Sequence, residues 1–161
     1  MNDSSKLSRM ALESGAIRLS PEKPFTWASG YKMPIYNDNR LLLGKAEYRS
    51  FIAQIFAKYS EASVDNVDVI AGTATAGIPH ATTLADRLSK PLIYVRATTK
   101  SHGMGNQIEG PLVPGQKVLL IEDLISTGGS AINAVNAIRK AGGILEHCFC
   151  IFSYGFIEAR Q

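Results

Sequence analysis

The sequence predicts an α/β fold with a mostly parallel central sheet that is flanked by helices. Three observations lead to this prediction. The 161 residues suit one domain, and their 45% hydrophobic content is enough for a sizeable core. From residue 67 onward, short apolar runs alternate with segments of helical periodicity. The apolar runs are rich in β-branched residues, which is typical of parallel strands buried on both faces by helices.

The first 44 residues predict a small element in front of the core, and residues 45–161 predict the core itself. Apolar residues between positions 7 and 14 repeat at helical spacing, and this helix is expected to stop at Gly15. Two strand-like segments flank the turn signal Ala28-Ser29-Gly30 and predict a hairpin-like element outside the main sheet. These segments are 25–27 and 33–36.

The core is expected to begin with a helix and to continue as alternating strands and helices. Apolar residues from Tyr48 to Tyr59 repeat at helical spacing and predict a helix with a buried stripe. Cys148 and Cys150 lie in the last strand and are expected to be strand residues, not disulfide partners or metal ligands. The elements after the first helix are expected over 67–71 (strand), 78–88 (helix), 92–95 (strand), 117–122 (strand), 130–141 (helix) and 144–153 (strand).

Charge and hydropathy exclude two classes of partner. The net charge of +3 is mildly basic, but no block of five like charges is present, so no nucleic-acid partner is expected. The longest apolar runs are far shorter than the roughly 20 residues of a membrane span, so no membrane partner is expected either. The polar start Met1–Lys6 lacks the apolar core of a secretory signal, which predicts a soluble, cytoplasmic protein.

Two loops follow predicted strands at the sheet edge where α/β proteins bind ligands. The first, Gly72–Gly77, is small and rich in hydroxyl groups, so it can approach a diphosphate without obstruction. An ordinary tight turn explains the same residues equally well. Thr73 and Ala74 are the candidate binding residues of this loop.

The second loop combines two carboxylates with a hydroxyl- and glycine-rich turn that opens a helix. The amides and hydroxyls of residues 126–130 suit a phosphate at the positive end of the helix dipole. Glu122 and Asp123 suit hydrogen bonds from neighbouring ribose hydroxyls, and a helix-capping role is the alternative for these acids. The candidate binding residues here are Glu122, Asp123, Leu124, Ile125, Ser126, Thr127, Gly128, Gly129 and Ser130.

A long polar loop over residues 96–110 follows the strand predicted at 92–95. Loops of this length inside a compact domain are usually functional or disordered. Its cations Arg96, Lys100 and His102 suit a lid that closes on an anionic substrate and neutralises a departing pyrophosphate. A solvated surface excursion is the alternative.

Taken together, these segments resemble the orotate phosphoribosyltransferase family, a branch of the type I phosphoribosyltransferases. Residues 118–130 are similar to the phosphoribosyl pyrophosphate signature of the wider group. Residues 25–30 with 34–36 are similar to the amino-terminal base-covering element of the narrower family, and 96–110 is similar to its catalytic loop. Residues 72–79 also fit, so the similarity covers nearly the whole chain.

The resemblance implies a magnesium-dependent enzyme of pyrimidine biosynthesis that converts orotate and phosphoribosyl pyrophosphate into orotidine 5′-monophosphate and pyrophosphate. It implies that magnesium arrives with the phosphoribosyl pyrophosphate, with Asp123 as the candidate protein ligand. It also implies a homodimer in which the catalytic loop reaches the partner's site. The residues implied to be catalytic are Arg96, Lys100, His102 and Asp123, and those implied to contact orotate are Ser126, Ile35 and Tyr36.

The chain also departs from the family pattern. Some members carry lysines where this chain has Ala28, Ala76 and Ala97. The family usually continues for several tens of residues past a point like Phe156, so the chain is expected to be short at its carboxyl end. Two alternative functions remain open: a phosphoribosyltransferase for a purine base, and a non-catalytic regulator that senses phosphoribosyl pyrophosphate.

Overall fold

The computed structural model describes residues 2–27, 30–63, 66–98 and 106–160. Its contacts divide the chain into two compact units, Met1–Arg49 and Ser50–Gln161. The sequence predicts one domain, with an amino-terminal element over 1–44 and a core over 45–161.

The first unit opens with the predicted helix, α1 (Asp3–Glu13). Asn2 caps its start, because the Asn2 side chain accepts a 2.8 Å hydrogen bond from the amide of Ser5. Met10 lies on its buried face. Gly15 follows the helix in the left-handed conformation, with φ of 74°, as the sequence predicted.

Two small antiparallel sheets complete this unit. β1 (Ile17–Leu19) pairs with β4 (Ile35–Asn37), and β2 (Phe25–Thr26) pairs with β3 (Lys32–Met33). The hairpin is therefore confirmed, but the continuous strand expected over 33–36 is wrong. Pro34 lies where that segment divides between the two sheets, since proline has no N–H for a strand ladder. A 3-10 helix, η1 (Asn39–Gly44), follows.

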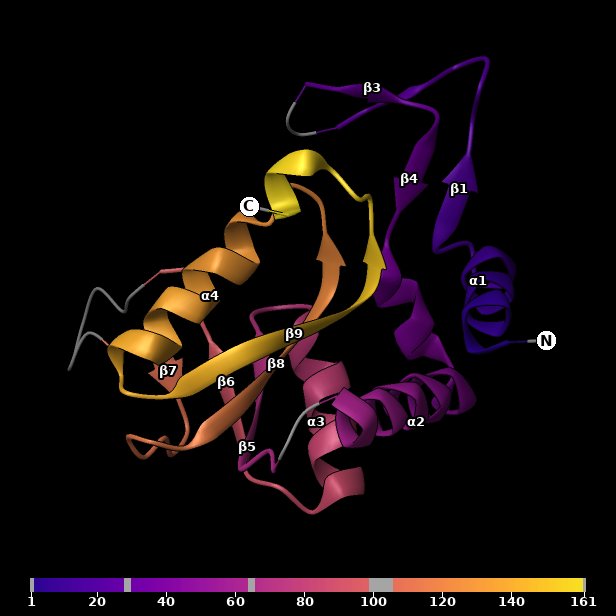
Figure 1. The fold of residues 1–161 in the computed structure, drawn as a ribbon. Coiled ribbons are helices and arrows are strands. Elements are labelled where there is room, and N and C mark those ends of the chain that lie inside the picture. Colours follow the sequence, from indigo (N-terminus) through magenta and orange to yellow (C-terminus); the bar gives the residue numbers. More distant parts are fainter. Residues whose placement is uncertain (1, 28–29, 64–65, 99–105, 161) are drawn as a thin grey trace. The chain divides into compact units, whose positions relative to one another are not determined.

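The second unit is built on one five-stranded sheet, in the order β7-β6-β5-β8-β9. Every neighbouring pair is parallel except β6 with β7, so the prediction of a mostly parallel sheet is confirmed (Figure 1). The strands are β5 (Val69–Thr73), β6 (Leu92–Val95), β7 (Ile108–Glu109), β8 (Lys117–Ile125) and β9 (Ile144–Ser153).

Two strand boundaries differ from the prediction in ways that matter for the site. β5 is shifted toward Thr73, and β8 continues to Ile125 instead of ending at Glu122. Pairing with β9 explains the extension, because Leu124 and Ile125 still have partners on that strand. β7, a strand of two residues, interrupts the expected polar loop.

Helices cover both faces of the sheet. On one face, Ala134 and Ile138 of α4 (Gly129–Lys140) pack with the side chains of Val69 and Ala71. On the other, a Cβ atom placed on Gly72 would lie 2.9 Å from the Cβ atom of Ala81 in α3 (Gly77–Leu88). Successive β5 residues therefore face opposite helices, as the period of a strand requires, and Figure 1 shows α4 and α3 on opposite sides.

The long helix predicted after residue 45 is α2 (Ala46–Ser63). Its apolar stripe is buried at Tyr48, Ile52 and Phe56, and the Phe56 ring lies 6.0 Å from that of Phe149 in β9. Tyr59 was expected in the same stripe but is 46% exposed. It lies in the last part of the helix, where its ring meets the ammonium group of the neighbouring Lys58 at 6.0 Å.

The two cysteines are free thiols in β9, as predicted. Burial raises the pKa of Cys148 to about 12 and that of Cys150 to about 11. Among the helices of the described residues, none is long and apolar enough to cross a bilayer.

Candidate functional site

Three of the segments selected from the sequence meet at one edge of the sheet. β5 ends at Thr73 and pairs with both β6 and β8, so the carboxyl ends of the three strands are neighbours. A cavity of about 120 Å³ lies there. Its lining brings together five predicted site residues: Thr73, Ala74, Arg96, Gly129 and Ser130.

The carboxylate of Glu122 lies at the centre of the hydrogen bonds at this edge. One of its oxygens accepts from the Thr73 hydroxyl at 2.6 Å and from the Asp123 amide at 3.0 Å. The other accepts from the Ser130 hydroxyl at 2.7 Å. Glu122 is only 4% exposed, and its side chain already accepts three hydrogen bonds inside the protein. Its contact with the ribose stays a prediction.

The loop after β5 packs closely against the end of β8. A Cβ atom on Gly77 would lie 2.5 Å from the carbonyl oxygen of Ile121 and 2.5 Å from the Thr73 hydroxyl. Any side chain at Gly77 would collide with backbone, so glycine is required by the close approach of the two segments. The peptide bond between Ala74 and Thr75 is cis.

Two helices begin at this edge without a side-chain cap. The cap residues are Ala76 for α3 and Gly128 for α4, and neither provides a capping hydrogen bond. By contrast, Asn2 caps α1 in the first unit. Uncapped first-turn amides and the positive end of the helix dipole suit an anionic ligand, so both helix starts are compatible with phosphate binding.

Asp123 follows Glu122 and is half-buried in β8. Burial raises the pKa of Asp123 to about 7, and a side-chain hydrogen bond with Glu122 and the charge of Glu122 act in the same direction. Two adjacent carboxylates share this space, and Asp123 is the one whose pKa is raised.

Hydrogen bonds join the two ends of the long loop. The Arg96 amide donates a 2.9 Å hydrogen bond to the Gln107 carbonyl, and the Gln107 side chain donates to the Arg96 carbonyl at 3.1 Å. The Arg96 guanidinium also lies 3.6 Å from the Glu109 carboxylate. Lys100 and His102, the other predicted catalytic cations, lie outside the described residues.

Sequence reasoning missed Asn133, which lines the same cavity. Its side-chain amide donates a 3.0 Å hydrogen bond to the carbonyl of Ala97 at the start of the long loop. Helical spacing was the available signal, since Asn133 lies three residues after Ser130 and therefore on the same helix face.

The remaining predicted phosphate residues lie at the end of β8 and in the turn before α4. Leu124 and Ile125 are half-buried strand residues, and Ser126 and Thr127 follow in the turn. Gly128 adopts φ of 87°, a conformation that favours glycine. A Cβ atom at Gly128 would lie 3.5 Å from Ala159 in the short helix η2 (Ile157–Arg160).

The residues predicted to contact orotate from the first unit lie in β4. The Tyr36 ring is 5.6 Å from that of Phe25, and the Arg18 guanidinium lies 5.1 Å from the Tyr36 ring centroid. Ile35 precedes Tyr36 and accepts a hydrogen bond from the indole of Trp27 at 3.1 Å. Tyr36 therefore packs with Phe25 and Arg18, and Ile35 is joined to Trp27 through its backbone carbonyl.

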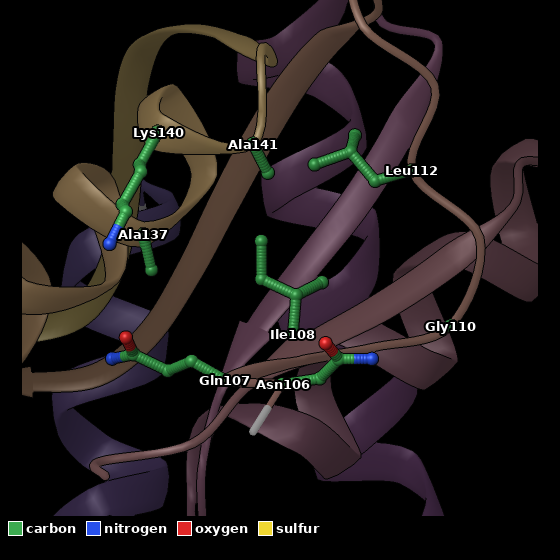
Figure 2. Close-up of a pocket in the computed structure, with 8 residues that line it drawn as sticks. All are labelled: Asn106, Gln107, Ile108, Gly110, Leu112, Ala137, Lys140 and Ala141. Atoms are coloured by element: carbon green, nitrogen blue, oxygen red, sulfur yellow. The ribbon is translucent and has the colours of Figure 1, made fainter. Parts of the chain in front are cut away.

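A larger cavity of about 450 Å³ lies elsewhere in the second unit (Figure 2). It is formed by β7 and its flanks with the last turn of α4, the helix end opposite Ser130. Ile108 points into it toward Leu112 and Ala141, and Lys140 lies on its rim (Figure 2). Among the predicted site residues that the structure describes, none lines it, so the smaller cavity is the better candidate despite its size.

Comparison with known proteins decides the family. Residues 42–153 match the model of the phosphoribosyl transferase domain. Orotate phosphoribosyltransferase of Listeria monocytogenes serotype 4b (strain F2365) is 51% identical over 161 residues, which are 100% of this chain and 77% of that protein. This chain belongs to the orotate phosphoribosyltransferase family. The enzyme of the same name from Streptococcus sanguinis (strain SK36) is 47% identical over 97% of this chain and 75% of its own length.

Solved structures agree with a type I phosphoribosyltransferase fold. The crystal structure of orotate phosphoribosyltransferase from Aeropyrum pernix has a TM-score of 0.84 at 30% identity, covering 96% of this chain and 85% of that one. An adenine phosphoribosyltransferase from Saccharomyces cerevisiae has a TM-score of 0.74 at 20% identity, over 95% and 93% of the two chains. Since enzymes named for different bases share this fold, membership of the orotate family rests on sequence identity.

Two of the three positions that hold alanine instead of lysine lie at the site. Ala76 is the cap residue of α3, and Ala97 lines the small cavity. Ala28 lies outside the described residues. Family members with lysines at positions 76 and 97 would have more positive charge at this edge.

Proposed function

We propose that this chain transfers the 5-phosphoribosyl group from phosphoribosyl pyrophosphate to orotate, giving orotidine 5′-monophosphate and pyrophosphate. The observation that carries the proposal is the 51% identity to a curated orotate phosphoribosyltransferase over the whole chain. That match includes residues 1–41, which precede the match to the general domain model. The reaction belongs to pyrimidine biosynthesis, and the two free thiols suit the reducing cytoplasm.

In this proposal the two uncapped helix starts receive the phosphate groups. The turn from Ser126 to Ser130 holds the 5′-phosphate at the start of α4, and the loop with Thr73 and Ala74 holds the diphosphate at the start of α3. Asp123 accepts hydrogen bonds from the ribose hydroxyls. Ser126, Ile35 and Tyr36 contact orotate.

Magnesium would enter this site with the substrate. The described residues contain no cluster of three or more His, Cys, Asp or Glu side chains that would cage a cation. Magnesium usually binds one or two carboxylates together with substrate phosphates, and Asp123 fits this pattern as the protein ligand. A bound magnesium ion would supply positive charge to offset the negative charge of the diphosphate, with Asp123 as the residue that would hold it.

Catalysis in this proposal is electrostatic. The bond from the ribose carbon to pyrophosphate loosens before the base nitrogen bonds, so negative charge grows on the leaving group. Arg96, Lys100 and His102 stabilise this charge, and closure of their loop keeps water from hydrolysing the sugar donor.

One assay tests the proposal and separates the alternatives. Purified protein is incubated with magnesium and phosphoribosyl pyrophosphate, and pyrophosphate release is measured with orotate, adenine, guanine or uracil. Of the four bases, we expect only orotate to give pyrophosphate release. Turnover with a purine and none with orotate would replace the proposal with the purine enzyme, and binding without any turnover would replace it with the sensing regulator.

The proposed homodimer, in which Arg96, Lys100 and His102 serve the partner's site, has its own test. Within the single chain, Arg96 lines the same cavity as Thr73 and Ser130. A direct experiment therefore asks whether the loop serves its own site or the partner's. Lys100→Ala and Asp123→Asn variants are each assayed alone and then after mixing. If the loop is shared, mixed dimers regain activity that neither variant has alone; if each chain uses its own loop, mixing restores nothing.

A further inference from the structure

We propose that Glu109 is a positioning residue, which orders the Arg96 guanidinium for the diphosphate of the substrate before the substrate binds. This inference rests on the proposed function, because it assigns a partner to one of the proposed catalytic cations. Arg96 lines the small cavity together with Thr73 and Ala74, the residues proposed to hold the diphosphate. Its guanidinium Nη1 lies 3.6 Å from Oε1 of Glu109.

The pairing of β6 with β7 places these two side chains on one face of the sheet edge. In this antiparallel pair, Tyr94 lies opposite Glu109. Arg96 continues the register, since its amide donates a 2.9 Å hydrogen bond to the Gln107 carbonyl. Glu109 is two residues from Gln107, so it lies diagonally across from Arg96 on the same face, within reach of a long side chain.

Glu109 belongs to a segment that packs closely on the sheet. The next residue, Gly110, has φ of 101°, and a Cβ atom there would lie 2.9 Å from the Leu92 carbonyl oxygen. The backbone after Glu109 is therefore in direct contact with β6. The Glu109 side chain is 24% exposed, whereas the Arg96 side chain is 41% exposed. The carboxylate is the more enclosed partner, and the guanidinium, on the longer side chain, is the one that it orders.

Glu109 has two opposing effects on a bound diphosphate. An arginine side chain loses much rotamer freedom when it is fixed on an anion, and Glu109 restricts Arg96 before the anion arrives. The negative charge of Glu109 also repels the diphosphate. Because both side chains are partly exposed, solvent and salt screen this repulsion. We therefore expect the ordering of Arg96 to be the larger effect.

Two simpler roles for Glu109 predict different results. Charged side chains on edge strands prevent association between sheets, and β7 is an edge strand. Such a role leaves the affinity for pyrophosphate unchanged. A negative charge that merely lies near an anion site weakens binding, so its removal strengthens binding. Positioning predicts the opposite sign, because the affinity for an anion falls when the negative charge is removed.

The experiment is a calorimetric titration of the full chain with inorganic pyrophosphate in the presence of magnesium. The variants are Glu109→Gln, Arg96→Ala and the double variant, and the control is Glu146→Gln, the same charge change at an exposed position of β9. We expect Glu109→Gln to raise the Kd by about three- to tenfold, the effect of fixing one long side chain in advance. In the Arg96→Ala background the same change should lower the Kd or leave it unaltered, because no guanidinium remains to be ordered.

The sign of the change in the two backgrounds decides between these roles. A Kd for Glu109→Gln at or below the wild-type value overturns the inference, and so does an equal rise in the Arg96→Ala background. Thermal melts identify any variant that fails to fold. If Glu109→Gln is unfolded, Glu109→Asp decides instead, because it keeps the charge on a shorter side chain. Positioning then predicts a raised Kd, whereas a pure charge effect predicts the wild-type value.

Turnover of orotate by the wild-type protein keeps the two proposals apart. A wild type that turns over orotate while its Glu109→Gln variant binds pyrophosphate normally contradicts the positioning role alone. A wild type that shows the expected change of sign but does not turn over orotate contradicts the proposed function alone.

Discussion

The side-chain amide of Asn133 donates a hydrogen bond of 3.0 Å to the backbone carbonyl of Ala97. Asn133 lies in α4, the helix whose start forms the proposed phosphate site, and Ala97 follows Arg96 at the start of the long loop. The bond therefore links the phosphate-binding helix directly to the loop that carries the predicted catalytic cations.

Replacing Asn133 with alanine should lower kcat/KM for phosphoribosyl pyrophosphate by about five- to tenfold, the effect of losing one hydrogen bond that fixes the loop. Because the side chain is exposed, stability should change little. Asn136→Ala is the matched control, an exposed asparagine one turn further along the same helix that does not line the cavity. Equal kcat/KM values for the two variants would remove the anchoring role.

Lys100→Ala should depress turnover by about a hundredfold, the typical cost of removing one group that stabilises charge in the transition state. The melting temperature should stay that of the wild type. Lys140→Ala provides the control, since this lysine lies on the rim of the larger cavity, away from the site. Unaltered turnover in Lys100→Ala would remove the lid hypothesis.

Phosphoribosyl pyrophosphate should bind more tightly as the pH rises through about 7, where Asp123 ionises. A neutral carboxyl group is a weaker acceptor for the ribose hydroxyls than a carboxylate is, so kcat/KM should follow the ionised form. In Asp123→Asn this step should be missing. A wild-type profile that is flat between about pH 6 and pH 8 contradicts the assignment.

The same ionisation should act on stability with the opposite sign. The raised pKa means that, above the ordinary pKa of 3.8, the folded protein binds this proton more strongly than the unfolded chain does. The stabilisation from Asp123 is therefore complete below that value and is lost as the pH rises through about 7. Thermal melts across this range should show the wild type losing stability relative to Asp123→Asn.

Gly77→Ala should lower the free energy of unfolding by about 1–3 kcal/mol, the usual cost of overpacking. The added methyl group would meet the Ile121 carbonyl and the Thr73 hydroxyl. Gly44→Ala is the control, because a Cβ atom there meets nothing within 4 Å. Chemical denaturation measures both changes, and a Gly77→Ala variant as stable as Gly44→Ala would contradict the close packing of this loop.

The sequence predicted the parts of the fold that depend on local pattern. The strands at 92–95 and 144–153 have the observed bounds, because apolar runs between turn signals define them without reference to partners. The division at Pro34 and the extension of β8 to Ile125 were missed, because both depend on which strand pairs with which. Pairing is a property of the assembled sheet.

For the site, sequence reasoning placed Thr73 and Ser130 together, since the ends of parallel strands must meet, whereas it expected Arg96 at the partner's site. It could not foresee that Glu122 is satisfied from within the protein. Glu122 and Asp123 are adjacent acids in the same sequence pattern. Only the fold shows that Glu122 is enclosed by Thr73 and Ser130, whereas Asp123 is half-buried.

The division of the chain near residue 49 also bears on how the family could diversify. The residues proposed to bind the sugar phosphate all lie in the second unit. Ile35 and Tyr36, which are expected to contact the base, lie in the first. A segment exchange at this boundary would therefore replace the base contacts of Ile35 and Tyr36, while Ser126 and the phosphate-binding residues of the second unit would stay the same. The choice of acceptor would then depend on residues of both units, and the binding of the phosphoribosyl group on residues of the second unit alone.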